Sequence, residues 1–274
     1  MKTMKKFISP NTWFEFEYPE AWFEFEDGEG AFLFYNPDVW DGNFRISGFK
    51  GETPSYGEEF VRDEIDYNLK LKPYDLSDAD GAYEVSYFEQ DEHEFASHRW
   101  YIGLRDMGFV CTFTVLKHSS IALAEQIIKS IKVRDLSEKY PAEIIPVRLS
   151  EIYAIDEAYE SIAKFVKDTF SKDFQGIEED VASLSKILDD QMFSAKKRER
   201  WIDLGLTLAV IMANEIEGIE WKTLIDGNRE APVLFYNPTG VIIDPLKLVW
   251  SRVKAGENFS ITESYQDALA SLHA

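Results

Sequence analysis

The stretch WFEFEYPEAWFEFE, residues 13–26, holds the pentapeptide WFEFE twice. Aromatic and acidic residues alternate in each copy, which predicts a strand with one buried face. Phe14 and Phe16 fall on the buried face of the first copy, and Phe23 and Phe25 on that of the second. The intervening Tyr-Pro-Glu-Ala has the chemistry of a turn. The sequence therefore predicts a β-hairpin with the two copies as its arms.

The predicted hairpin has one unfavourable cross-strand pair. Antiparallel closure places the phenylalanines of the two copies opposite each other, which stabilises a sheet. It also places Glu15 opposite Glu24, and like charges directly opposite destabilise a sheet. Three explanations stay open: the carboxylates are well solvated, the register differs, or a cation or basic partner lies there.

The rest of the first half continues as strands and two helices. A period of two predicts strands, and helical spacing of apolar residues predicts helices. Cys111 shares a strand face with Phe109 and Phe113, so we expect it in the core. The predicted elements are strands at Ala31–Tyr35 and Asn43–Phe49, a helix reaching Lys70, a three-strand meander at Ala82–Gln90, Glu94–Leu104 and Phe109–Lys117, and a closing helix ending near Ile131.

The second half is helix-rich. Residues 136–149 contain two prolines and mixed charge, and they predict a linker with a short strand. Three helices follow, then three short strands near Glu220–Ile225, Val233–Tyr236 and Val241–Ile243. Asp244-Pro245 is a good cap and first-turn pair for the next helix. The expected class is α+β, with domains at residues 1–135 and 150–274 and a small three-stranded antiparallel sheet in the second.

The first half resembles PsbP-like domains, in which a first strand ends in a Y-P-x-x-W turn. The matching residues are Tyr18, Pro19, Trp22, Phe34, Tyr35 and the closing helix with Ala124, Glu125, Ile127, Ser130 and Ile131. This resemblance implies an α/β/α sandwich with a mostly antiparallel sheet. Such folds include photosystem accessory subunits and chaperones of secreted effectors, which mostly bind proteins.

The second half is similar to an uncharacterised bacterial family. The matching residues are Trp201, Leu204, Gly205, Glu220, Trp221, Asp226, Gly227, Asp244, Pro245, Arg252, Gly256 and Glu257. The pairing of the two halves resembles a two-domain bacterial protein of unknown function.

Charge restricts the partners. The 50 acidic residues outnumber 29 basic ones and give a net charge of -21. Such a field repels nucleic acid and anionic lipid, and it favours basic protein partners. The longest apolar run, Leu204–Ala213, is far shorter than the roughly 20 residues of a membrane span. No apolar segment follows the first lysines, so we expect a soluble, cytoplasmic protein that binds neither nucleic acid nor membrane.

Catalytic motifs are absent from the sequence. It has no GxGxxG, GxxxxGK[ST] or GxSxG pattern. His93 and His98 flank a predicted turn without the helical spacing of a zinc site, so we expect neither a metal nor a cofactor.

Two function classes remain. The leading hypothesis is a non-catalytic, protein-binding protein of the chaperone, immunity or adaptor kind, with a patch of Trp13, Glu15, Trp22 and Glu24 on the exposed sheet face. The alternative is a small-molecule binder or hydrolase with a cleft in the second domain or at the domain junction. Its candidate residues are Asp203, Glu220, Asp226 and Arg252.

Overall fold

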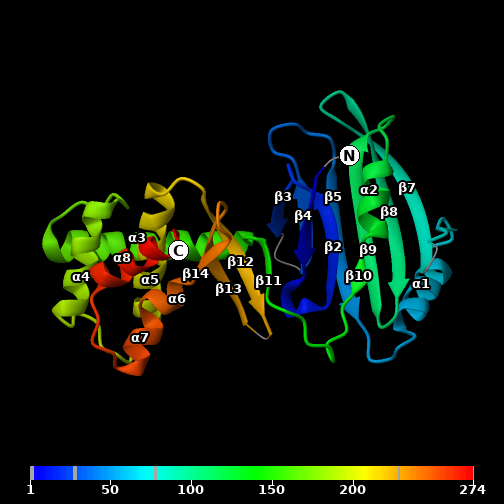
Figure 1. The fold of residues 1–274 in the computed structure, drawn as a ribbon. Helices are drawn as coiled ribbons and strands as arrows, with labels where there is room; N and C mark the ends of the chain where they lie inside the picture. Colours follow the sequence, from blue (N-terminus) through cyan, green and yellow to red (C-terminus); the bar gives the residue numbers. More distant parts are fainter. Residues whose placement is uncertain (1–2, 27–29, 77–78, 228, 274) are drawn as a thin grey trace. The chain divides into compact units, whose positions relative to one another are not determined.

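The chain forms two compact units, Met1–Lys139 and Tyr140–Ala274 (Figure 1). The computed structural model describes residues 3–26, 30–76, 79–227 and 229–273. Helices and strands are both abundant, and the paired strands in its sheets run antiparallel. The predicted α+β class is confirmed at this level.

The first unit is built on a seven-stranded sheet. The predicted meander is confirmed, because its three long strands occupy neighbouring positions. In spatial order the strands are β3 (Phe23–Glu26), β4 (Ala31–Tyr35), β5 (Asn43–Lys50), β9 (Met107–Leu116), β8 (His93–Leu104), β7 (Asp80–Gln90) and β6 (Lys72–Pro73).

One face of this sheet forms the main core of the unit. Phe109, Cys111 and Phe113 of β9 are at most 1% exposed, as their alternation predicted. Burial raises the pKa of the Cys111 thiol above its ordinary value, so Cys111 is a core residue as expected. Helix α2 (Ala122–Lys129) and a second, three-stranded sheet contribute the opposing side chains of this core (Figure 1). The α/β/α sandwich implied by the resemblance has helices alone on each face of the sheet. On this face the structure has helix α2 and a second sheet.

The predicted WFEFE hairpin is wrong. The first copy lies in β2 (Phe14–Pro19), which pairs with β1 (Met4–Ile8) and β10 (Lys132–Val133). The second copy lies in β3, which pairs with β4. Strand β1 explains the difference, because it places buried Phe7 opposite Phe16 and so provides the apolar pairing that the hairpin was expected to supply.

The other face of the sheet is covered at one end by α1 (Tyr56–Tyr67). Val61 of this helix packs with Ala82 and Tyr101 of the sheet. The helix approaches closely at two glycines: a Cβ at Gly103 would lie 2.1 Å from the backbone oxygen of Gly57. Only residues without side chains permit this contact.

The second unit joins a helical core to a four-stranded sheet. The sequence predicted three strands in this sheet, and that number is wrong by one. The additional strand, β11 (Glu143–Pro146), lies inside the segment expected as a linker and pairs with the open edge of β12. Buried Trp201, Leu204 and Leu208 lie in the core. The elements are α3 (Leu149–Phe170), α4 (Val181–Asp189), α5 (Arg198–Glu215), β12 (Ile219–Asp226), β13 (Arg229–Tyr236), β14 (Val241–Ile243), α6 (Pro245–Leu248), α7 (Trp250–Ala255) and α8 (Ile261–Ser271), with short 3-10 turns at Pro10–Thr12 and Glu178–Asp180.

The predicted cap of α6 is confirmed. Asp244 caps α6, since its Oδ1 accepts from the Leu246 backbone N–H at 3.0 Å. Its Oδ2 also receives a hydrogen bond from Arg229 at 2.6 Å. A Cβ at Gly205 would lie 2.5 Å from the carbonyl oxygen of Pro245, so a close approach of α6 to α5 explains this glycine inside an apolar helix.

Candidate functional site

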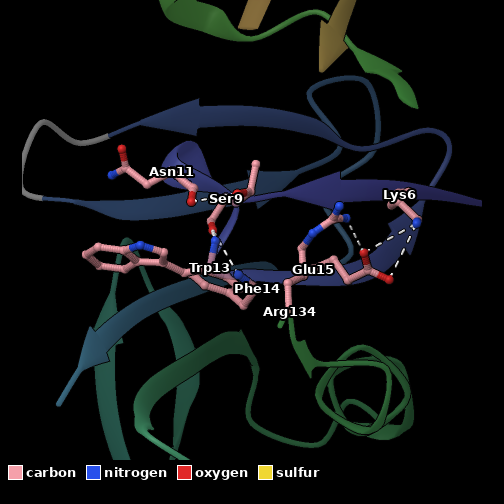
Figure 2. Close-up of polar contacts among 8 residues, drawn as sticks. Lys6, Ser9, Asn11, Trp13, Phe14, Glu15 and Arg134 are labelled. Carbon is pink, nitrogen blue, oxygen red and sulfur yellow. Dashed lines mark hydrogen bonds and ion pairs between the residues drawn. The ribbon is translucent and has the colours of Figure 1, made fainter. Parts of the chain in front are cut away.

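Glu15 belongs to an ion-paired cluster and does not face Glu24. Figure 2 shows its carboxylate between Arg134 and Lys6, at N–O distances of 2.6 and 3.4 Å. The Arg134 side chain is 3% exposed and that of Glu15 is 16% exposed. Of the three explanations left open, a different register and a nearby cation both hold: β2 has other neighbours, and the cation comes from the same chain.

The two tryptophans of the repeat have different environments. Ser9 Oγ accepts from the Trp13 and Phe14 backbone N–H groups at 3.1 Å, which fixes the half-buried Trp13 at the start of β2 (Figure 2). Trp22 is 0% exposed, and its Nε1 donates to Asp41 at 3.0 Å. The expectation that Trp22 lies on the surface is wrong, because the core side of β3 follows Trp22 and Glu24 and leaves Phe23 outside.

The exposed side chains of the first unit gather elsewhere on the sheet. Strand registers align the residues that point away from the core into three rows, and none of them is buried. We call this surface the open face. Its rows are Phe88–Phe95–Leu116; Ser86–Ser97–Thr114–Asn43–Tyr35–Phe23; and Glu84–Arg99–Thr112–Arg45–Leu33–Phe25.

Large apolar side chains lie at both ends of the open face. Phe23 is 52% exposed, Phe88 42% and Leu116 43%. The ring of Trp40, which is 43% exposed, meets Phe95 edge-on at 5.6 Å between centroids. Exposed apolar side chains that lie together, as Phe88, Phe95 and Leu116 do, mark interaction sites more often than isolated ones do.

The open face carries little charge in a strongly acidic chain. Its charged residues are Arg45, Arg99 and Glu84, and Arg99 lies 3.5 Å from Glu84. The strands between the apolar ends contribute hydroxyl and amide groups, such as those of Thr114 and Asn43. These groups can form hydrogen bonds with a partner while the aromatic residues are buried against it.

The edges of the sheet are poor sites for strand addition. The outer strands are β3, with four residues, and β6, with two. Short edge strands protect a sheet from pairing with a further chain. A partner that binds here is therefore expected to contact the face of the sheet.

The four cleft candidates of the second unit do not converge. Glu220 and Asp226 lie at opposite ends of β12, which corresponds to a separation of about 20 Å along an extended strand. Arg252 donates to Glu257 at 3.1 Å and to Ser264 at 2.7 Å. Burial raises the pKa of Asp203 above its ordinary value, but no hydrogen bond or ion pair within the described residues joins it to the other three candidates.

The exposed Glu220 forms an ion pair and hydrogen bonds with neighbouring side chains. It accepts from Lys222 at 2.7 Å and from Asn237 at 2.8 Å, and these two bonds lower the pKa of its carboxyl. Its neighbours thus stabilise the charged form, which is the opposite of what a general acid needs.

The histidines do not form a metal site. His93 and His98 are five positions apart on β8, so they lie on opposite faces of the sheet. The Nδ1 atom of His98 is hydrogen-bonded to the Tyr83 hydroxyl at 2.6 Å. Across the parts of the chain that the structure describes, no group of three potential ligands could hold a metal. No helix in these parts is long and apolar enough to cross a bilayer.

Sequence reasoning expected Trp13, Glu15, Trp22 and Glu24 on one exposed sheet face, whereas the structure buries Trp22 and pairs Glu15 with Arg134 and Lys6. The period of two in β7 and β8 places Phe88 on one face with Ser86 and Glu84, and Phe95 on one face with Ser97 and Arg99. Recognising the open face also required the register of six strands, which the sequence does not supply.

Comparison with known proteins gives families without an assigned function. One family model, "Domain of unknown function (DUF3805)", matches residues 2–156, and "Domain of unknown function (DUF3806)" matches residues 180–265. None of the curated proteins matches the chain.

Two solved structures match the chain to very different degrees. A crystal structure from Bacteroides thetaiotaomicron VPI-5482 is 50% identical, covers 97% of this chain and 98% of its own, and has a TM-score of 0.92. The solution structure of cyanobacterial PsbP from Synechocystis sp. PCC 6803 is 12% identical, covers 49% of this chain and 94% of its own, and has a TM-score of only 0.27. Because the first family model matches more than half of this chain, the chain belongs to the family described as "Domain of unknown function (DUF3805)".

Proposed function

We propose that this chain is a non-catalytic protein-binding protein whose partner docks on the open face. The observation that carries the proposal is the exposure of Phe23, Phe88 and Leu116, each more than 40% accessible. Among the described residues of the first unit, α1 is the helix that packs on this face of the sheet. Burying such side chains would supply about 25 cal/mol for each Å² removed from water.

The partner that this face fits differs from the one that the composition favours. The net charge of -21 favours a basic partner, yet the open face presents Arg45 and Arg99 against Glu84. A largely uncharged partner surface, with apolar side chains at its two ends and hydrogen-bonding groups between them, is the better complement. The acidic remainder of the chain would then act mainly on solubility and on the rate of encounter.

Site-specific photo-crosslinking in the native host tests the proposal. A benzophenone side chain at Phe88 should capture a protein partner, whereas the same group at Tyr153, an exposed position of the second unit, should not. The purified partner should bind the unmodified chain but not a Phe88→Ser/Leu116→Ser variant that retains its circular dichroism spectrum. Binding that persists in the folded variant, or equal capture from both positions, would contradict the proposal.

The alternative, a small-molecule or hydrolytic site in the second unit, has less support. Arg252 and Glu220 are occupied by neighbouring side chains, and the four candidates are spread over α5, α7 and the two ends of β12. A cytoplasmic location and a PsbP-like ancestry of the first unit remain predictions from sequence. Fractionation of the native host tests the location.

A further inference from the structure

The segment that enters α5 carries an excess of positive charge in a strongly acidic protein. Residues 196–200 read KKRER, four bases and one acid, whereas acids outnumber bases 50 to 29 in the whole chain. Lys196 and Lys197 end the connection from α4, and Arg198 is the first residue of α5. We call Lys196, Lys197 and Arg198 the basic turn.

The backbone of the basic turn is held by buried neighbours. Phe193, just before the turn, is 7% exposed, and its ring meets that of Trp201 edge-on at 5.5 Å between centroids. The Trp201 Nε1 atom donates to the Ser194 carbonyl oxygen at 3.1 Å. The same oxygen accepts from the Lys197 backbone N–H at 2.9 Å. The three cations are therefore displayed on a fixed backbone, which reduces the ordering cost when a partner binds.

The three side chains of the basic turn remain available to a ligand. All three are exposed, and within the described residues none of them forms an ion pair, a side-chain hydrogen bond or a cation–π contact. The next base along α5 differs from them. Arg200 donates to the Ser161 hydroxyl and lies over the Phe193 ring, so its side chain belongs to the packing of the unit.

The position of these cations is unfavourable for the helix itself. Lys197 is the N-cap of α5 and provides no side-chain cap, and Arg198 lies in the first turn. The start of a helix is the positive end of its dipole, where cations are unfavourable and anions are favourable. Helix stability therefore does not explain the basic turn, and a bound anion would relieve the repulsion.

A short acidic protein segment fits the basic turn better than nucleic acid or a membrane does. The net charge of -21 opposes a long chain of phosphates, because such a chain would extend past the turn by more than the screening distance of about 8 Å. Binding to a lipid surface usually combines basic with exposed apolar side chains. Within the described part of residues 154–241, no large apolar side chain is exposed.

We propose that the basic turn binds a short acidic segment of a partner protein, whose successive carboxylates pair with Lys196, Lys197 and Arg198. Successive side chains of an extended segment are about 3.4 Å apart along the chain, so a few residues bring several carboxylates within reach of the turn. Arg198 can also hold a carboxylate through two parallel hydrogen bonds. This surface lies in the second unit and is cationic, whereas the open face is largely uncharged, so the two proposals are independent.

Fluorescence anisotropy of a labelled hexaglutamate peptide, titrated with the full chain at low ionic strength, tests the proposal. Lys196→Gln/Lys197→Gln/Arg198→Gln should weaken saturable binding by roughly tenfold or more through loss of three charge pairs. Lys129→Gln/Lys164→Gln/Lys254→Gln makes the same change in net charge on exposed lysines elsewhere and should leave the affinity unchanged. Lys196→Arg/Lys197→Arg, which preserves the charge, should also retain binding.

The basic-turn variant should not lose stability, because its three changes remove cations from the start of a helix. Its melting temperature should equal or exceed that of the unmodified chain, so that lost binding reports on the ligand and not on unfolding.

Several outcomes would overturn the proposal. One is the absence of saturable hexaglutamate binding, and another is an equal loss of affinity in both triple variants, which would reflect net charge alone. A third is tighter binding of an oligothymidylate of equal charge, or of phosphatidylglycerol vesicles, with the same dependence on the basic turn. Such a result would assign the surface to nucleic acid or to a membrane.

Discussion

Gly205→Ala should destabilise the second unit, although alanine is the better helix former. In an open helix interior this change would stabilise by about 1 kcal/mol. Here the new Cβ would lie 2.5 Å from the Pro245 carbonyl oxygen, and real Cβ contacts essentially never fall below 3.0 Å. The two backbones would therefore have to separate by about 0.5 Å or more, and overpacking of this kind costs about 1–3 kcal/mol.

The obstacle at Pro245 cannot move easily. The proline ring restricts its own backbone, and the preceding Asp244 is held by Arg229 and by its cap on α6. We therefore expect a net loss of about 1 kcal/mol in the free energy of unfolding.

Urea denaturation measures this loss, and hydrogen exchange assigns it to α5 and α6. Thr169→Ala, on the exposed side of α3, is the matched control, because it improves helix propensity without a new contact and should stabilise by a few tenths of a kcal/mol. If Gly205→Ala stabilised the protein as much as this control, the steric reasoning would be refuted.

Three further predictions concern the first unit. Trp22→Ala should cost about 3–5 kcal/mol, because Trp22 is fully buried and bonded to Asp41; unchanged urea denaturation would show that the ring contributes no packing. Glu15→Gln and Arg134→Gln should be coupled by about 1 kcal/mol or more in a double-mutant cycle, and additive losses would contradict a direct pair. Burial lowers the pKa of His98 below its ordinary value of 6.5, so nuclear magnetic resonance titration should show it more than half neutral at pH 6.5. Its contribution to stability should be complete above that pH and be lost as the pH falls towards the lower, folded-state pKa; a pKa at or above 6.5 would contradict this.

The sequence was sufficient for elements whose signals are local. The period-two runs located β7, β8 and β9, and the apolar alternation around Cys111 identified a core strand. The Asp244-Pro245 pair marked the start of α6 because capping depends on a few adjacent residues.

The errors came from interactions between distant segments. Alternation in WFEFE indicated two strands but could not identify their partners, since a strand edge pairs with any suitable neighbour. The partner β1 was missed because it is short and shows no alternation of polar and apolar residues: two lysines are followed by Phe7 and Ile8.

The pairing of β2 with β10 has a consequence for synthesis of the protein. Lys132 lies opposite Glu15, and Glu15 bonds to Arg134 across 119 positions of sequence. A ribosome therefore releases the aromatic strand β2 long before the residues that complete its sheet. Until then Phe14 and Phe16 lack part of their native surroundings, and such incomplete states are prone to aggregation. The nascent first unit is accordingly expected to need a chaperone until residue 134 has left the exit tunnel.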